Sequence, residues 1–234
     1  MLSYCQVVLA LLAFAYYPAP YANALVMDPH ESLIQQGIEP HPGPSAPGSV
    51  RVEAINISHL ANNWPFISAV DATFTGISEH SLLPHELALQ RTKALESGWA
   101  TLGTTLDPEL KHNTGGVAGV VKTPRKMCKL TALDPGFRKL LESVRANLLA
   151  VDLGLTVPVV VITIYGWTGG RQSTTQALRT DAMIAIIRDE FEMQPHGPKL
   201  IAGDGNASCE DLPNLLEMIL EEGWTDVGSV QHLC

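Results

Sequence analysis

Residues 199–206 are Lys-Leu-Ile-Ala-Gly-Asp-Gly-Asn, a short apolar strand that stops at a glycine and then presents a carboxylate and an amide two residues apart. Glycine allows the backbone to turn sharply, so Asp204 and Asn206 can both face one pocket at the carboxyl edge of the strand. This layout suits a metal-assisted hydrolase. The alternative is an Asx-turn, a hydrogen-bonded turn without chemistry that any Asp-Gly-Asn can form.

The chain upstream contains further strand-like apolar segments, most of which end near a polar side chain. In chain order they are residues 50–60 with Asn56, residues 67–80 with Glu79, the glycine-led residues 115–121, and residues 157–165 with Tyr165 at the end and Arg171 six residues later. In this order they resemble the motifs of the endonuclease/exonuclease/phosphatase superfamily, which are the Asn of the first strand, Gln-Glu, Gly-Gly-Val, the Tyr-containing strand and Gly-Asp-x-Asn. The resemblance covers about residues 49–234. It implies an α/β fold, the DNase-I-like four-layer α/β sandwich.

The resemblance also implies a divalent metal, Mg²⁺ or Mn²⁺. Mg²⁺ prefers hard oxygen ligands, commonly one or two carboxylates together with waters and substrate phosphate. Glu79 is the expected ligand, and Asn56 is expected beside it as a ligand or a ligand-orienting amide. The alternative for Glu79 is an ordinary surface carboxylate.

The other motif residues are assigned roles around the phosphate. Asp204 is expected to orient or deprotonate the attacking water, and Asn206 to hold the phosphate oxygens. Tyr165 is expected to donate to a phosphate or leaving oxygen, and Arg171 to hold the phosphate with two parallel N–H bonds. Trp-Thr at residues 167–168 departs from the Pro-Asn of the apurinic endonucleases. The alternatives are a core tyrosine at a strand end and a solvated arginine.

The superfamily pattern continues beyond Gly-Asp-x-Asn, to a Ser-Asp-His motif whose histidine is a principal catalytic group. This sequence ends at Cys234 without that motif, and His232 is too close to Asp204 in sequence to take its place. We therefore expect a truncated domain that lacks its C-terminal strands. Because a general acid or base typically contributes about 10²–10⁴-fold in rate, DNA cleavage is expected to be weak or absent.

Composition and charge limit the function classes. The 234 residues are 46% hydrophobic and 17% charged, as in globular proteins. The formal net charge of −9 argues against a general nucleic-acid coat protein, since phosphate binding depends on Lys and Arg. However, 8 of the 15 basic residues form a basic cluster in sequence: Lys111, Lys122, Arg125, Lys126, Lys129, Arg138, Lys139 and Arg145. This basic cluster could bind a phosphate backbone, or it could be a solvated loop and helix face.

The N-terminal residues divide into two segments before the main domain at residues 49–234. Residues 1–26 are apolar and end in an A-x-A-like pattern at residues 22–24, as in a signal peptide, but no Lys or Arg precedes Arg51. Their apolar stretch is too short to span a bilayer. Residues 27–48 are rich in Pro and Gly and are expected to be a linker. Localisation stays open: secreted if residues 1–24 are a signal peptide, intracellular and nuclear if the chain is a retroelement endonuclease.

The linker carries a second resemblance. Residues 37–44, Gly-Ile-Glu-Pro-His-Pro-Gly-Pro, are similar to the tail of ribosome-skipping peptides, which precede the endonuclease in some non-LTR retrotransposons; Gly37 and His41 depart from that pattern. The pairing of the two resemblances favours a retroelement-derived DNA endonuclease, with DNA as substrate and no stable protein partner. Two alternatives stay open, a phosphoesterase of the same fold acting on a phosphoinositide, sphingomyelin or nucleotide, and a non-catalytic remnant.

Helical signals complete the α/β pattern. Pro84 and Gly98 delimit a helix over residues 84–97, because proline suits a first turn and glycine follows a helix end. Apolar residues near helical spacing predict two more helices. The predicted apolar stripes are Leu178, Ile184, Ile187 and Phe191 in residues 174–193, and Leu215, Leu216, Ile219 and Leu220 in residues 213–222.

Overall fold

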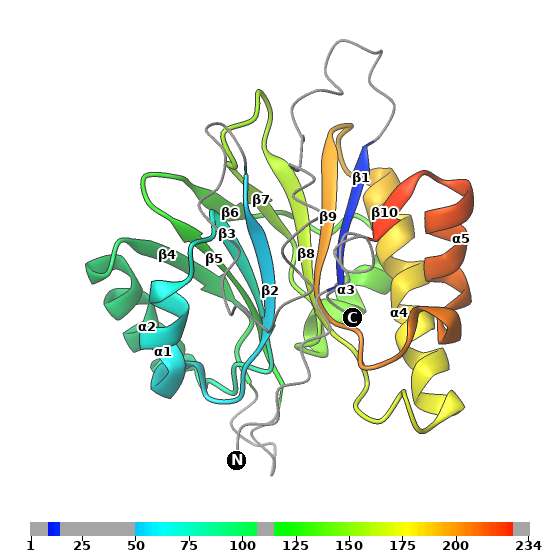
Figure 1. The fold of residues 1–234 in the computed structure, drawn as a ribbon, viewed down its shortest axis with the longest axis horizontal. Helices are drawn as coiled ribbons and strands as arrows, with labels where there is room; N and C mark the ends of the chain where they lie inside the picture. The colour runs from blue at the N-terminus through cyan, green and yellow to red at the C-terminus, as the bar shows by residue number, and fades with distance from the viewer. Residues whose placement is uncertain (1–8, 15–49, 107–114, 227–234) are drawn as a thin grey trace, which may run out of the picture.

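The computed structural model describes residues 9–14, 50–106 and 115–226 and contains two β-sheets (Figure 1). Their strands are β1 (Leu9–Phe14), β2 (Val52–Asn56), β3 (Phe74–Ser78), β4 (Trp99–Gly103), β5 (Val117–Lys122), β6 (Met127–Lys129), β7 (Leu149–Val151), β8 (Val159–Tyr165), β9 (Pro198–Asp204) and β10 (Trp224–Asp226). The smaller sheet has the order β2-β3-β5-β4, and the larger has the order β10-β1-β9-β8-β7-β6. Two pairs are parallel, β2 with β3 at the edge of the smaller sheet and β8 with β9 in the middle of the larger one.

Helices cover the outer face of each sheet, so the predicted four-layer α/β sandwich is confirmed (Figure 1). The helices are α1 (Leu60–Ala69), α2 (Pro84–Glu96), α3 (Pro135–Glu142), α4 (Thr174–Met193), α5 (Pro213–Glu221) and the short 3₁₀ helix η2 (Cys209–Asp211). One apolar cluster joins α1 and α2 to the smaller sheet, and another joins α3, α4 and α5 to the larger sheet. A third cluster, which includes Phe74 and Leu200, fills the space between the sheets.

The predicted helices and strands lie close to the observed ones, with one correction. The helix predicted over residues 174–193 is α4, and Gly98 has φ +80° just after α2, as a helix-ending glycine requires. In contrast, the strand expected over residues 67–80 begins only at Phe74, because residues 67–69 belong to α1. Burial of Trp64 and Ile67 against the smaller sheet stabilises α1 although Pro65 lies inside it.

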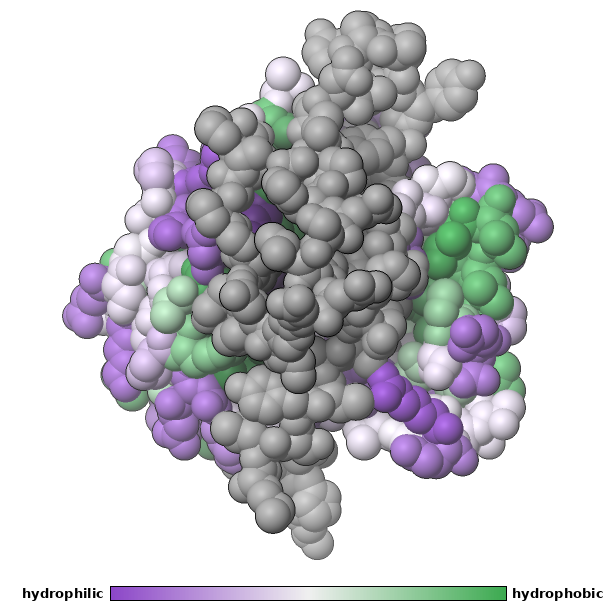
Figure 2. All heavy atoms as spheres, viewed as in Figure 1, coloured by the Kyte–Doolittle hydropathy of each residue, from purple (hydrophilic) through white to green (hydrophobic). Residues whose placement is uncertain are grey.

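Two predicted helix stripes are also corrected. On α4, Ile184, Ile187 and Phe191 are buried as predicted, but Leu178 is 54% exposed. On α5, the buried residues are Leu215 and Met218, whereas Leu220 is 78% exposed. Figure 2 shows apolar side chains gathered on the outer surface over α5. The apolar residues of α5 therefore surround the helix, and their spacing alone does not identify the face that packs on the sheet.

The described part of the N-terminal apolar segment is a strand of the larger sheet. β1 pairs antiparallel with β9, from Leu9 opposite Gly203 to Phe14 opposite Pro198, and its other edge pairs with β10. Cleavage at residues 22–24 would remove this strand from the sheet, and export stays a prediction. Residues 15–26 and the linker at residues 27–48 lie outside the described residues. No helix in the described part of the chain is long and apolar enough to cross a membrane.

Candidate functional site

The predicted site residues from the two sheets meet where the parallel strands end. Asn56 ends β2, Glu79 directly follows β3, Tyr165 ends β8 and Asp204 ends β9. Carboxyl ends of neighbouring parallel strands lie at the same edge of a sheet, and the facing sheets bring two such edges together. Asn56 Nδ2 donates to Asp204 Oδ2 at 2.5 Å, although the residues are 148 positions apart. This hydrogen bond joins the two sheets at the site.

The backbone before Asp204 is fixed by two small residues. The buried Ser78 hydroxyl donates to the Ile164 carbonyl oxygen at 2.7 Å and accepts from the Asp204 N–H at 3.1 Å, so it ties β3 to both β8 and β9. Gly203 has φ +144°, and a Cβ there would lie 2.1 Å from the Ile164 carbonyl oxygen. Only glycine allows this close approach of β8 and β9.

Asp204 forms the Asx-turn that was the alternative for this position, and it also bonds to the other sheet, while its catalytic role stays a prediction. Its Oδ1 accepts from the Asn206 N–H at 2.8 Å, which is the local bond of an Asx-turn, and its Oδ2 accepts from Asn56. Asn206 has φ +53°, and its Nδ2 donates to the Gly166 carbonyl oxygen at 3.1 Å. The turn therefore orients the carboxylate toward the other sheet. Asp204 is 9% exposed, so its charge lies in a partly desolvated position.

Glu79 is the second carboxylate of the site, and it has φ +61°. A left-handed backbone at a residue other than glycine is uncommon and is often found at functional sites. Burial raises the pKa of the Tyr165 hydroxyl, and the neighbouring Glu79 carboxylate raises that pKa further. Tyr165 and Thr168 share a hydrogen bond of 3.0 Å. Tyr165 therefore stays protonated and can donate toward the site.

A group of cationic and aromatic side chains next to Tyr165 was not predicted. The Arg145 guanidinium lies 5.2 Å from the centre of the Tyr165 ring and 4.9 Å from the centre of the Trp167 ring. Its Nη1 donates to the carbonyl oxygens of Tyr165 at 3.2 Å and Gly166 at 2.8 Å. Arg179 of α4 lies 4.7 Å from the centre of the same Trp167 ring. The sequence signal for Arg145 was the basic cluster, and nothing in the sequence distinguished it from the other members.

Arg171 lies in the loop that follows β8, and its side chain is exposed. The preceding Gly170 is close to the Gly-Asp-Gly-Asn turn, since a Cβ on Gly170 would lie 2.4 Å from the Asn206 carbonyl oxygen. The loop that carries Arg171 is therefore beside the site, and phosphate binding by its guanidinium stays a prediction.

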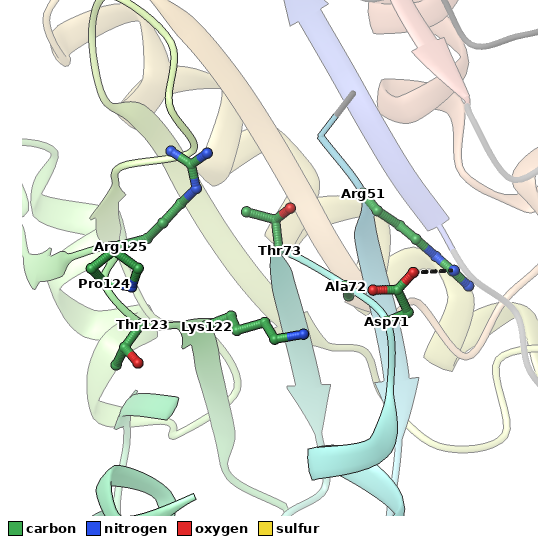
Figure 3. A pocket seen from close by; sticks show the side chains of 8 residues that line it. All are labelled: Arg51, Asp71, Ala72, Thr73, Lys122, Thr123, Pro124 and Arg125. Carbon is green, nitrogen blue, oxygen red and sulfur yellow. Dashed lines mark ion pairs between the residues drawn. The ribbon is translucent and has the colours of Figure 1, made fainter. Parts of the chain in front are cut away.

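The described members of the basic cluster do not gather on one surface at the site. Lys122 and Arg125 line a small cavity of about 170 Å³ with Arg51 and Asp71 (Figure 3). Arg51 precedes β2, whereas Asn56 ends it, so the cavity and the site lie at opposite ends of that strand. Carboxylates pair with both arginines, Asp71 with Arg51 at 3.8 Å and Asp152 with Arg125 at 3.6 Å. Arg145, in contrast, lies at the site.

The oxygen donors of the site fit the ligand preferences of Mg²⁺. The described residues contain no group of three His, Cys, Asp or Glu side chains close enough to hold a metal ion. Asn56 and Asp204 are joined by a hydrogen bond, and Glu79 follows Ser78, the residue that pairs with Asn56 at the end of β3. Mg²⁺ usually binds proteins through one or two carboxylates and keeps several waters, and this small donor set could hold it.

Comparison with known proteins relates this arrangement to solved structures. No protein-family model matches the sequence, and no curated protein matches it. A 3′ phosphatase (NExo) from Neisseria, bound to product DNA hairpin, matches with 16% identity and a TM-score of 0.52, covering 73% of this chain and 71% of that one. An AP endonuclease from Archaeoglobus fulgidus matches with 11% identity and a TM-score of 0.52, with 72% and 70% covered. The APE2 catalytic domain of Xenopus laevis matches with 14% identity and a TM-score of 0.52, with 72% and 67% covered.

Proposed function

The chain has the DNase-I-like fold of the endonuclease/exonuclease/phosphatase superfamily, and we propose that it is a metal-dependent phosphodiesterase that acts on DNA. The observation that carries the proposal is the 2.5 Å hydrogen bond from Asn56 to Asp204. It joins a carboxylate and an amide from different sheets at the edge where Glu79 and Tyr165 also lie. A carboxylate held in place in this way is suited to act on a water molecule beside a phosphate.

In this proposal each side chain has a defined role, and Asn56 has two. Asp204 orients the attacking water and takes its proton, and Asn56 holds the Asp204 carboxylate in place. The Tyr165 hydroxyl donates to a phosphate or leaving oxygen, which is consistent with its raised pKa. Asn206, in the turn after β9, and Arg171, in the loop after β8, bind the phosphate oxygens of the substrate.

Glu79 and Asn56 would hold the divalent metal, Mg²⁺ or Mn²⁺. When bound, such a cation supplies positive charge to the phosphate oxygens and lowers the pKa of a coordinated water. The left-handed backbone at Glu79 supports this role, because a strained conformation of this kind is retained where the side chain needs a particular direction.

The described residues place no histidine in hydrogen-bond contact with the proposed site. No hydrogen bond in this part of the chain joins a histidine to Glu79, Asp204 or Asn56, and the buried His80 is bonded to the backbone at Thr104 and Leu82. The loss of one general acid or base, here the histidine, typically lowers the rate by about 10²–10⁴-fold.

DNA is the proposed substrate, and a non-LTR retroelement is the proposed origin. One similar structure is a phosphatase with bound product DNA, which supports a nucleic-acid substrate for this fold. The sequence of residues 37–44 supports the origin. If the substrate is instead a phosphoinositide or a nucleotide, the same site residues act on a smaller ester.

The experiment is a plasmid-nicking assay with the full 234-residue chain in the presence and absence of Mg²⁺. We expect slow nicking that requires the metal and is lost in Asp204→Asn, which keeps the side-chain shape but removes the charge. Asp211→Asn, an exposed position in η2, is the matched control and should retain nicking. Nicking that survives in Asp204→Asn would overturn the proposed site.

Metal binding gives a readout that does not depend on turnover. Calorimetric titration with Mg²⁺ or Mn²⁺ should show binding to the wild-type chain that is lost in Glu79→Gln and retained in Glu96→Gln, an exposed position at the end of α2. If the chain binds the metal and hydrolyses a phosphoinositide but does not cleave DNA, the substrate is the phosphoinositide and not DNA. Absence of both metal binding and cleavage would identify a non-catalytic remnant.

A further inference from the structure

Trp167 lies at the edge of the proposed site and is contacted by two guanidinium groups. Arg145 lies 4.9 Å and Arg179 lies 4.7 Å from the centre of the indole ring. The backbone N–H of Trp167 donates to the Thr180 hydroxyl at 3.0 Å, which attaches the loop after β8 to α4. Cation–π contacts of this length are favourable, so the indole holds Arg179 of α4 close to the end of β8.

The two guanidiniums form no ion pair with a carboxylate among the described residues. Within the described ranges, neither Arg145 nor Arg179 has a carboxylate oxygen within 4.0 Å. In contrast, Arg188, which is on α4 like Arg179, has two such partners, Glu217 at 3.1 Å and Glu222 at 3.3 Å. Arg145 donates to carbonyl oxygens, and Arg179 makes a long contact of 3.4 Å with the Gln176 side chain.

This unbalanced charge lies in a chain whose formal net charge is −9. Burial lowers the pKa of the Arg145 guanidinium, and the positive charge of Arg179 acts in the same direction, while Tyr165 and Glu79 act against it. Two like charges that affect each other are unfavourable unless an anion lies near them. An anion from the substrate would remove that cost.

We propose that Arg179, held by Trp167, binds the phosphate next to the scissile phosphate in a DNA strand. Arg179 is exposed and donates weakly within the protein, so it can reach a ligand, whereas Arg145 is committed to the backbone after β8 and positions Trp167. A guanidinium matches the geometry of a phosphate through two parallel N–H bonds. The inference rests on the proposed function and makes it specific: the substrate is a polynucleotide with adjacent phosphates, not an ester with one phosphate.

The test is binding of a fluorescent DNA duplex measured by anisotropy over a range of salt concentrations, with EDTA present so that no cleavage occurs. Arg179→Met should weaken binding by roughly tenfold and reduce the slope of log K against log salt by about 0.9, the value for one phosphate contact. Arg179→Lys should keep most of the slope but lose part of the affinity, since it keeps the charge without the planar fork.

Arg188→Met is the matched control, because it removes the same charge from the same helix at a position paired with Glu217 and Glu222. It should bind DNA with wild-type affinity and slope. If Arg179→Met also has the wild-type affinity and slope, the role of Arg179 is overturned while the proposed function stands. If the wild-type chain binds neither the duplex nor a dinucleotide, DNA as substrate is overturned, and the role of Arg179 is overturned with it.

Discussion

At the scale of single residues, Ser78 has the most consequential hydrogen bonds in the structure. It occupies the position before Glu79, where the superfamily motif has glutamine, and its hydroxyl connects β3 to the Ile164 carbonyl and the Asp204 N–H. All of these groups are buried, so none of them can exchange the bond for one to water. The short Ser78 side chain therefore sets the distance between the two sheets at the site.

We predict that Ser78→Ala destabilises the protein by about 1–3 kcal/mol, because it leaves a buried N–H and a buried carbonyl without this partner. Urea unfolding followed by circular dichroism measures the change. Ser68→Ala is the control, since that hydroxyl bonds locally to the Pro65 carbonyl on α1 and its loss should change stability little. Equal stability of the two variants would mean that the Ser78 link contributes nothing.

His80 gives the protein a pH dependence of stability. Its imidazole is fully buried, with Nδ1 accepting from the Leu82 N–H and Nε2 donating to the Thr104 carbonyl oxygen, both at 3.0 Å. Burial lowers the pKa of His80 from 6.5 to about 4. Above the unfolded pKa both states are neutral. As the pH falls from about 6.5 to about 4, the unfolded chain takes up a proton that the folded protein does not, so stability is lost in this window.

Since each pKa unit corresponds to about 1.4 kcal/mol, the full loss from His80 is about 3 kcal/mol, of which about 2 kcal/mol is expected between about pH 7 and about pH 4.5. Urea unfolding at about pH 7 and about pH 4.5, in EDTA, measures it. His80→Gln keeps a donor and an acceptor but does not titrate, so its stability should fall less than that of the wild-type protein over the same interval. The same fall in both proteins would assign the pH dependence to other groups.

At the scale of elements, β1 is the segment whose place is least expected from its sequence. An apolar run near the N-terminus, typical of a signal peptide, forms a strand between β9 and β10. A strand with neighbours on both edges uses its N–H and carbonyl groups in both directions. β1 thus protects the edge of β9, the strand that ends at Asp204.

Leu11→Pro should destabilise the protein by about 1–3 kcal/mol, because proline removes a ladder N–H from a central strand and leaves its partner without a bond. Thermal unfolding monitors the effect, and light scattering should show more aggregation because part of β9 becomes an open edge. Leu11→Val keeps the N–H and serves as control. If Leu11→Pro is as stable as Leu11→Val, residue 11 does not pair with β9 or β10.

At the scale of the whole molecule, the site depends on how closely the two sheets approach. A Cβ on Gly76 of β3 would lie 2.9 Å from the Ala202 Cβ and 3.3 Å from the Thr163 Cγ2 atom, so the sheets are in contact there without room for a methyl group. Ala202 precedes Asp204 by two positions on β9. Any separation of the sheets at this contact lengthens the hydrogen bond from Asn56 to Asp204.

Gly76→Ala is therefore expected to cost about 1–3 kcal/mol through overpacking and to reduce nicking further. The double variant Gly76→Ala with Ala202→Gly moves the methyl group from one sheet to the other and should recover part of the stability. A double-mutant cycle with the two single variants measures the coupling, expected to exceed about 0.5 kcal/mol. If the two changes in the free energy of unfolding are additive, the two positions are not in steric contact.

Local patterns in the sequence predicted five strand segments, three helices and the order of the motifs. β-branched and apolar runs ended by glycine or by a polar residue identified the strands, and helical spacing identified α4, because these are local properties of the chain. The same local reasoning placed Asn56, Glu79, Tyr165 and Asp204 at strand ends. Their roles in catalysis stay proposals.

Which segments lie together depends on tertiary packing. It placed β1 beside β9, separated Lys122 from the site at which Arg145 lies, and brought Arg179 to Trp167. Such contacts join residues from different elements and depend on which faces of the sheets and helices pack together. Residue spacing does not determine these contacts. An apolar segment can be buried, and a basic side chain can be solvated, at several places in the fold.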